Sequence, residues 1–261
     1  MLARTLALFV AFTLAPNVRA DDATDPESKL KDYLKTIKGA ETARVTALTG
    51  DGVKETFPDY VLFGVLFPQY PVARVAPAPL KSTNVIAVPK KDGKPVLVTS
   101  EKELEAFFKK HAQAVKKPAD AEEVARAWLR AAAELHQDGF YKFTIKTGVG
   151  TASGETITVS GEAPVDPQGG NKGEVKSTLA FKEGKLATVE TKVNLKPGIR
   201  PICQATKLLD PDPIVRGMAE QSIRVMGSAA KPYLDEQKAK ATPQLREAID
   251  RAWARIIAEG R

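Results

Sequence analysis

Apolar residues recur three and four residues apart in several parts of this chain, which is the spacing of one face of an α-helix. The pattern predicts helices over residues 30–37, 101–115 and 120–135. The second of these opens with Ser100 and Glu103, a capping-box pair that satisfies free N–H groups at a helix start. Each predicted helix has one apolar face and therefore needs a neighbouring layer to cover it.

Strand-like sequence fills most of the first half of the chain. Residues 44–49 and 60–67 favour strands, and the second segment is apolar on both faces, which is typical of a central, fully covered strand. Residues 84–88 and 95–99 flank Lys90-Lys91-Asp92-Gly93, so we expect a β-hairpin there. The proline-rich stretch 67–80 is expected to cross the surface as an extended loop.

Apolar and polar residues alternate from residue 141 to residue 195 in four segments, beginning with Tyr141, Phe143 and Ile145. This alternation predicts an antiparallel meander with one apolar face. Trp128, on the helix directly upstream, is expected to cover that face. The other face is interpreted as solvated, with a polar binding surface as the alternative. Its polar residues include Thr156, Thr158, Lys176, Thr178, Thr188 and Lys192.

The chain beyond Pro201 reads as helical, with three apolar stripes between Leu208 and the C-terminus. We therefore predict an α+β fold: an antiparallel meander covered by helices, followed by a C-terminal unit of three helices. The predicted division is a signal peptide over 1–20, an α+β body over 21–206 and a helical unit over 207–261 packed on the body. The first stripe of this unit comprises Val215, Met218, Ala219, Ser222 and Met226.

Two segments of this last unit, Asp212–Ala219 and Gly227–Leu234, resemble one HEAT-type helical repeat. The resemblance rests on Asp and Pro at a helix start, on Val-Arg with Ala three residues later, and on a small-residue turn before the next helix. It implies a binding scaffold, since arrays of such repeats bind partners. A single repeat cannot bury its own apolar face, so we expect this unit to borrow apolar neighbours from the body.

The whole chain after its first 20 residues is similar to exported bacterial proteins that have no assigned activity. Its middle region is loosely similar to cystatin-like and NTF2-like folds, an analogy that carries no function. Met1–Ala20 has Arg4, then an apolar run over Thr5–Leu14, and ends in a small residue suited to signal peptidase. We therefore expect a periplasmic or secreted product with no transmembrane anchor after cleavage of the signal.

The formal net charge is +7, with 27% charged residues. Basic residues are scattered rather than concentrated in a stripe, and aromatic residues do not alternate with them, so nucleic-acid binding is disfavoured. Cys203 is the only cysteine, so no disulfide within the chain can stabilise the fold in an oxidising compartment. Stability is expected to come from packing.

A hydrolase is one alternative that the residues leave open. Cys203 would need a histidine to form a thiolate, and the chain offers only His111 and His136. Two carboxylates facing each other across the meander could instead perform acid–base chemistry. The candidate pairs are Glu155 with Glu162, and Glu174 with Glu190.

Metal and cofactor motifs are not found in the sequence, and none is predicted. The chain has neither a His-Glu-x-x-His segment nor paired cysteines, and it has no calcium-loop spacing. Gly148, Gly150 and Gly154 have the composition of a phosphate loop, but they lie between two predicted strands and no helix start follows them. We interpret this segment as a hairpin connection.

Phe67, Gln69 and Tyr70 form the candidate binding site, because two aromatic rings stand in a loop stiffened by Pro68 and Pro71. A stiff loop loses little entropy when its rings bind a partner. The alternative is that both rings cover the edge of the core.

The function favoured by the sequence is that of an exported, non-enzymatic binding or scaffold protein that engages a partner protein or an envelope component. A periplasmic carrier that encloses a small apolar ligand between the meander and its helix is one alternative. The other is a hydrolase using Cys203 or a carboxylate pair. Oligomeric state and partner identity are left open.

Overall fold

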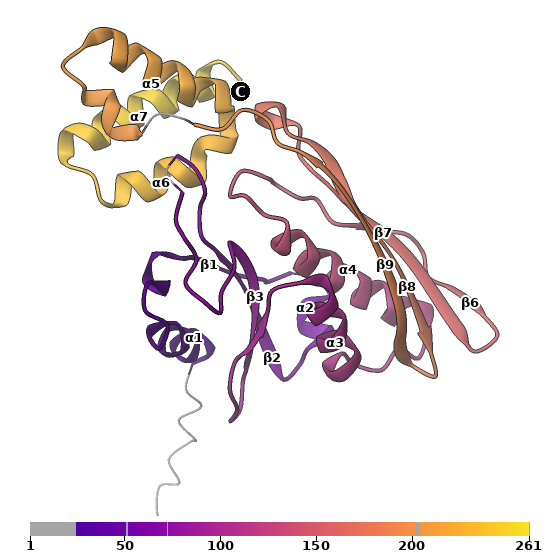
Figure 1. Cartoon of the computed structure of the whole chain (residues 1–261). Coiled ribbons are helices and arrows are strands. Elements are labelled where there is room, and N and C mark those ends of the chain that lie inside the picture. The colour runs from indigo at the N-terminus through magenta and orange to yellow at the C-terminus, as the bar shows by residue number, and fades with distance from the viewer. Residues whose placement is uncertain (1–24, 51, 72, 202–203, 261) are drawn as a thin grey trace, which may run out of the picture.

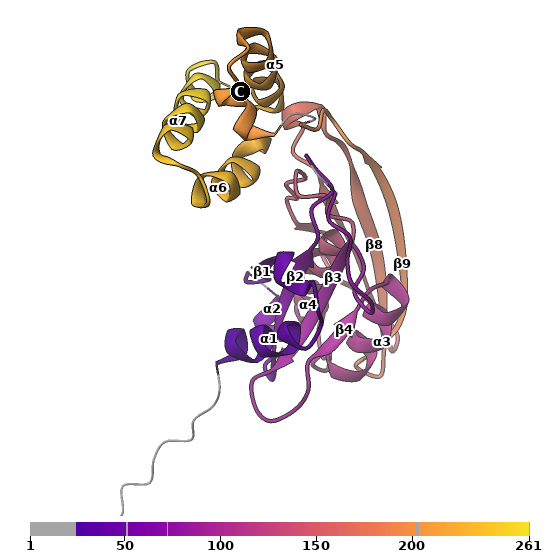
Figure 2. The same cartoon turned by 60° about the vertical axis from the view of Figure 1, so that its left-hand side comes forward.

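The computed structural model describes residues 25–50, 52–71, 73–201 and 204–260. The predicted signal peptide lies outside these residues. Residues 25–201, here called the body, form four layers: a helix, a four-stranded sheet, a helical layer and a five-stranded sheet (Figure 1). Residues 204–260, the tail, form a separate group of helices at one end of the body (Figures 1 and 2). The predicted α+β class is therefore confirmed.

The first sheet is antiparallel with its strands in sequence order, so β2 and β3 are central. Residues 62–66 of β2 are all buried, as predicted for a strand covered on both faces. Helix α1 covers one face through Leu30 and Leu34. The β3–β4 hairpin predicted around residues 90–93 is confirmed. The elements are α1 (Pro26–Lys35), η1 (Ala40–Thr42), β1 (Arg44–Ala47), β2 (Tyr60–Leu66), β3 (Thr83–Pro89) and β4 (Val96–Val98).

The helical layer consists of α2 (Val53–Thr56), α3 (Glu101–His111) and α4 (Pro118–Leu135). The Ser100 hydroxyl accepts a hydrogen bond from Glu103 N at 3.3 Å, so the predicted cap at the start of α3 is confirmed. The short helix α2 was not predicted. It packs close to α4 because Gly52 has no side chain: a Cβ there would lie 2.4 Å from the carbonyl oxygen of Glu123.

Helix α4 lies between the two sheets and packs on both of them (Figure 1). Trp128 is 1% exposed, and its indole N–H donates to the hydroxyls of Ser177 (3.0 Å) and Thr191 (3.2 Å) on the second sheet. The prediction that this helix covers the meander is confirmed. Small side chains let both sheets approach the helix closely, and the buried alanines are Ala121, Ala125, Ala127, Ala131, Ala132 and Ala133.

The second sheet is also antiparallel, in the order β5-β7-β8-β9, with β6 paired to β7. Gly148 N donates to Ser160 O at 2.8 Å, and the turn between β6 and β7 contains Gly154, whose φ is 59°. The hairpin interpretation is therefore confirmed for Gly154, whereas Gly148 and Gly150 interrupt the arm formed by β5 and β6, which both pair with β7. The strands are β5 (Lys146–Thr147), β6 (Thr151–Ser153), β7 (Thr156–Pro164), β8 (Lys172–Lys182) and β9 (Lys185–Lys196).

The first strand of the meander is shorter than predicted. Only Lys146–Thr147 forms β5, and the preceding residues are irregular except for one bridge between Phe143 and Val165. Just upstream, the Asp138 carboxylate accepts hydrogen bonds from the backbone N–H groups of Phe140 and Tyr141. These donors are therefore unavailable for pairing in a sheet.

The tail builds most of its own apolar core. Among the described buried residues of its apolar cluster, Phe140 is the only one from the body. We expected the tail to borrow apolar neighbours from the body, but among the described residues of this cluster the body contributes only the buried side chain of Phe140. Met218, predicted in the first stripe, is 58% exposed, because the buried face of α5 runs through Ala219, Ile223 and Met226. The elements are η3 (Ala205–Leu209), α5 (Pro213–Met226), η4 (Gly227–Ala230), α6 (Lys231–Ala239) and α7 (Pro243–Ala258), and η2 (Gln168–Gly170) contacts them from the body.

The cap residues of the tail agree with the sequence. The Asp212 carboxylate accepts from Ile214 N at 2.8 Å at the start of α5, and the Thr242 hydroxyl accepts from Leu245 N at 3.4 Å at the start of α7. Arg216 donates to the carbonyl oxygens of Asp210 and Pro211. Within the described ranges, no helix combines the length and the hydropathy needed to cross a bilayer.

Candidate binding site at the junction of body and tail

The three residues of the predicted site have different environments. Phe67 is 0% exposed and belongs to the core of the first sheet, so its ring is not at the surface. The Gln69 amide is exposed but donates to the carbonyl oxygens of Phe67 (2.9 Å) and Arg74 (3.1 Å), which fixes the loop. Tyr70 is 40% exposed. Of the two aromatic rings, only that of Tyr70 can meet a partner.

Tyr70 stands at the rim of a cleft of about 310 Å³ between the 67–80 loop of the body and α6 of the tail. The walls combine aromatic, amide and charged side chains, so the cleft can both stack and hydrogen-bond with an occupant. Its residues include Tyr70, Arg74, Gln204, Tyr233, Glu236 and Gln237.

Glu236 of α6 forms the main ion pairs of this cleft with the body. Its carboxylate accepts from Arg44 Nη2 at 2.9 Å and also from Arg74. Burial opposes ionisation of Glu236, but the hydrogen bond from Arg44 and the charge of Arg74 outweigh it, so the pKa of Glu236 is below its usual value. The carboxylate is therefore charged at neutral pH and links the loop to the tail.

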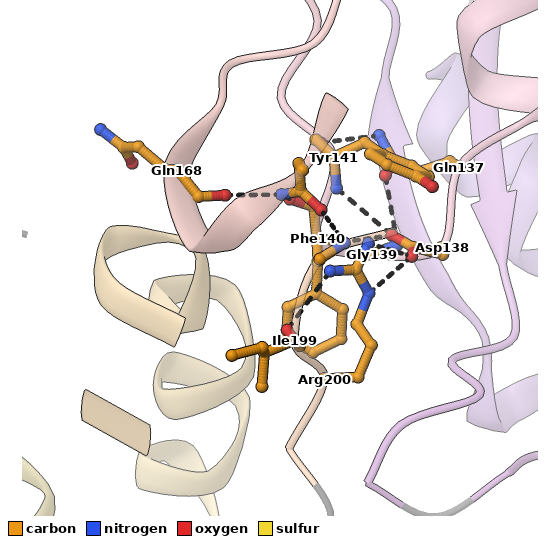
Figure 3. Close-up of polar contacts among 10 residues, drawn as sticks. Gln137, Asp138, Gly139, Phe140, Tyr141, Gln168, Ile199 and Arg200 are labelled. Atoms are coloured by element: carbon orange, nitrogen blue, oxygen red, sulfur yellow. Dashed lines mark hydrogen bonds and ion pairs between the residues drawn. The ribbon is translucent and has the colours of Figure 1, made fainter. Parts of the chain in front are cut away.

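A second ion pair, Asp138 with Arg200, lies beside Phe140 (Figure 3). Arg200 Nε donates to the Asp138 carboxylate at 2.7 Å, and its Nη2 lies 2.5 Å from the same oxygen. The guanidinium carbon is 5.1 Å from the ring centres of both Phe140 and Tyr141, within range of a cation–π contact. Burial and the Asp138 charge raise the pKa of Tyr141.

Asn171 fixes the chain segments around Phe140. It is 1% exposed, and its amide donates to the carbonyl oxygens of Phe140 (3.2 Å) and Gln168 (2.8 Å) while its own oxygen accepts from Gly198 N (3.1 Å). The ring centres of Tyr70 and Phe140 are 6.3 Å apart, and the rings meet edge to face. The exposed ring at the rim of the cleft is therefore supported by an ordered polar network.

Glu134 on α4 is a second notable group, and no sequence motif marked it. Burial raises its pKa to about 7, with the Arg130 charge only partly opposing this. Gly64 of β2 lies against it, since a Cβ on Gly64 would be 2.5 Å from Glu134 Oε2. Within the described part of the chain, Arg130 Nε is buried without a hydrogen-bond partner. A glycine in a predicted central strand was the one feature that indicated a close approach here.

The two histidines of the hydrolase alternative lie apart in the structure. Cys203 lies outside the described residues. His111 ends α3 between the rings of Tyr60 and Phe107, and burial lowers its pKa. His136, which follows the last residue of α4, lies 2.8 Å from Glu101 at the start of α3. The length of α3 therefore separates the two histidines by roughly 15 Å.

The proposed carboxylate pairs are also apart. Glu155 lies in the turn before β7, roughly 23 Å along the strand from Glu162. Glu174 faces Asn194 and Glu190 faces Thr178, so the strand register offsets these two acids by roughly 13 Å. Each candidate pair thus fails on geometry.

The space that a carrier would use is filled by side chains. Trp128, Leu129, Val159, Leu179 and Phe181 are all buried where α4 meets the second sheet. An apolar ligand would have to displace them. Among the residues that the structure describes, no three His, Cys, Asp or Glu side chains are grouped to hold a metal ion.

The comparisons with known proteins give no relative: no family model matches the sequence, and neither the curated proteins nor the solved structures include a significant match.

Proposed function

We propose that this chain is a non-enzymatic binding protein that engages a partner protein through the cleft between the 67–80 loop and α6. The observation that carries the proposal is the half-exposed ring of Tyr70 at the rim of a cleft whose two walls come from body and tail. Aromatic residues in preformed pockets are the usual anchors of protein interfaces. The resemblance of the tail to a HEAT-type repeat agrees with a binding role.

The proposed occupant is a short peptide segment of the partner. A volume of about 310 Å³ is at the small end for ligand pockets and suits one or two side chains. The amides of Gln204 and Gln237 and the Glu236 carboxylate offer hydrogen bonds to a peptide backbone. The Tyr70 ring offers a stacking surface for an apolar or aromatic side chain.

Site-specific photo-crosslinking tests this proposal. A photoreactive residue at Tyr70 is expected to form an adduct with one protein in the host cell, whereas the same group at exposed Lys102 on α3 should not. With that protein purified, Tyr70→Ala should weaken binding about tenfold and Tyr70→Phe should leave it nearly unchanged. Equal labelling at both positions, or binding that is insensitive to Tyr70→Ala, would contradict the proposal.

Export to the periplasm or the medium is the second part of the proposal, and it rests on the sequence of residues 1–20. It predicts that the mature chain purified from its host begins at Asp21. N-terminal sequencing measures this directly. A product that retains Met1 would contradict cleavage after Ala20.

A further inference from the structure

Strand β9 is the edge of the second sheet. It has 12 residues and, within the described ranges, pairs with β8 alone. Figure 2 shows it along the outer rim of the molecule. Its outer N–H and C=O groups are therefore free to pair with another strand, which is a risk that proteins usually control at sheet edges.

Of the features that usually block such pairing, the middle of β9 lacks proline and a bulge but carries the charges of Glu190 and Lys192. Residues 188–196 contain neither proline nor glycine, and the only register shift lies at the start of the strand, near Phe181 and Leu186. Val193 faces the same side as buried Val175, its partner on β8, yet it is 41% exposed. The exposed apolar side chain on the core-facing side indicates that a neighbour is missing beyond the edge.

Two charges on the opposite side of β9 are also without partners. In the described residues, neither Glu190 nor Lys192 forms an ion pair. Lys192 lies directly opposite Lys176 of β8, and like charges at facing positions are unfavourable. Lys176 itself is engaged by Glu174 at 2.8 Å. An acidic group on the free side of β9 would compensate Lys192.

We propose that a second copy of this chain pairs with β9 in antiparallel orientation, with Thr191 facing Thr191 of the other copy. In this register Val189 of one copy faces Val193 of the other, and Glu190 faces Lys192 of the other. The two-fold symmetry makes each of these pairs occur twice. All these pairs are favourable cross-strand neighbours. The result is one continuous sheet through both copies, joined by an isologous interface.

The charge pattern selects this register and this partner. Centring the pairing on Glu190 would place Glu190 against itself, and centring it on Lys192 would place two lysines together. Glu190 and Lys192 flank Thr191 symmetrically with opposite charges, so the strand is complementary to its own antiparallel copy. A strand from another protein would match this arrangement only if it carried the same order of charges.

Cysteine crosslinking tests the register, with Cys203→Ser as the background so that a single thiol is present. Thr191→Cys is expected to form an intermolecular disulfide, since facing Cα atoms lie about 4.5–5.5 Å apart, within the disulfide range of about 4.4–6.8 Å. Asn194→Cys is the matched control. It faces Thr188, so the two introduced thiols would be roughly 20 Å apart and should stay unlinked.

Charge reversal tests the pairing without a crosslink. Glu190→Lys and Lys192→Glu should each weaken dimerisation roughly tenfold in analytical ultracentrifugation, because both symmetric ion pairs become repulsive. Mixing these two variants should restore dimers, as should the double variant that carries both changes. Recovery on mixing also shows that each variant is folded.

The proposal would be overturned by a wild-type chain that stays monomeric at every concentration, by a dimer that is insensitive to the charge changes, or by crosslinking at Asn194→Cys equal to that at Thr191→Cys. A Thr191→Cys variant that captures a different protein in place of its own copy would also reject it. The cleft at Tyr70 plays no part in β9 pairing, so these outcomes are independent of the partner-binding proposal.

Discussion

The contact between α4 and the second sheet differs in kind from the contact between body and tail. The first is a continuous apolar layer centred on Trp128. The second contains Phe140 as the one apolar body side chain among the described residues of the tail's buried cluster, and beside it lie the buried polar residues Asn171 and Arg200 and the ion pair of Glu236 with Arg44. Each part has its own apolar core, so we expect changes at α4 to affect global stability and changes at the junction to affect mainly the attachment of the tail.

The largest effect is expected at Trp128. Trp128→Ala leaves a cavity between α4 and the second sheet and should lower the free energy of unfolding by about 3 to 5 kcal/mol. Denaturant titration measures this. Trp128→Phe retains most of the packing but leaves the hydroxyls of Ser177 and Thr191 without the indole donor, so it should cost about 1 kcal/mol. A near-neutral Trp128→Ala would show that the layer is not the main source of stability.

A smaller and more local effect is expected at the junction. Arg200→Ala leaves the Asp138 carboxylate without its cation and removes the contact with Phe140, at a cost of about 2 to 4 kcal/mol. Proteolysis between body and tail should accelerate, while hydrogen exchange of α4 stays slow. Arg200→Lys keeps the charge but not the two-atom contact, so it should be intermediate. Loss of protection in α4 would instead indicate one cooperative unit.

Local sequence patterns predicted much of the body. The alternation of β7 to β9, the apolar segment of β2 and the cap at Ser100 each depend on residues close in sequence, and each was confirmed. The role of Trp128 followed because its helix directly precedes the meander.

The junction could not be predicted in the same way. Arg200 is 62 residues from Asp138, and Asn171 bonds to Phe140 over 31 residues. A polar residue gives no periodic pattern that indicates such a distant partner. The first strand of the meander was predicted too long for a similar reason: alternation assigned Tyr141 to a sheet, but its N–H donates to the Asp138 carboxylate.

Two glutamates provide a pH test that separates the two regions, and Glu134 in the body should give the larger effect. Its pKa of about 7 is above the unfolded value of 4.5, so the folded state binds an extra proton between these pH values and stability falls as pH rises through this window. Glu134→Gln should therefore be nearly neutral at pH 4.5 and stabilising by about 1 to 3 kcal/mol at pH 8. Denaturant titrations at both pH values measure this.

The control for Glu134 is Gly64→Ala. The added methyl group would lie 2.5 Å from Glu134 Oε2 and should push the carboxyl toward solvent. Its pKa, followed by carbon-13 NMR, is expected to fall. An unchanged pKa in this variant would show that Gly64 does not determine the burial of Glu134.

Glu236 at the junction should give the smallest effect and the opposite sign. Its pKa is lowered, because the two arginines outweigh its burial, so its contribution is present above the unfolded pKa of 4.5 and is lost as pH falls through the lower folded value. Glu236→Gln should cost about 0.5 to 1 kcal/mol at pH 7 and little in acid, since the pair is partly exposed. Opposite pH slopes for Glu134→Gln and Glu236→Gln would support the contrast between a buried body and a polar junction. Equal slopes would contradict it, because charge at the junction would then be buried at the same cost as charge beneath the sheet.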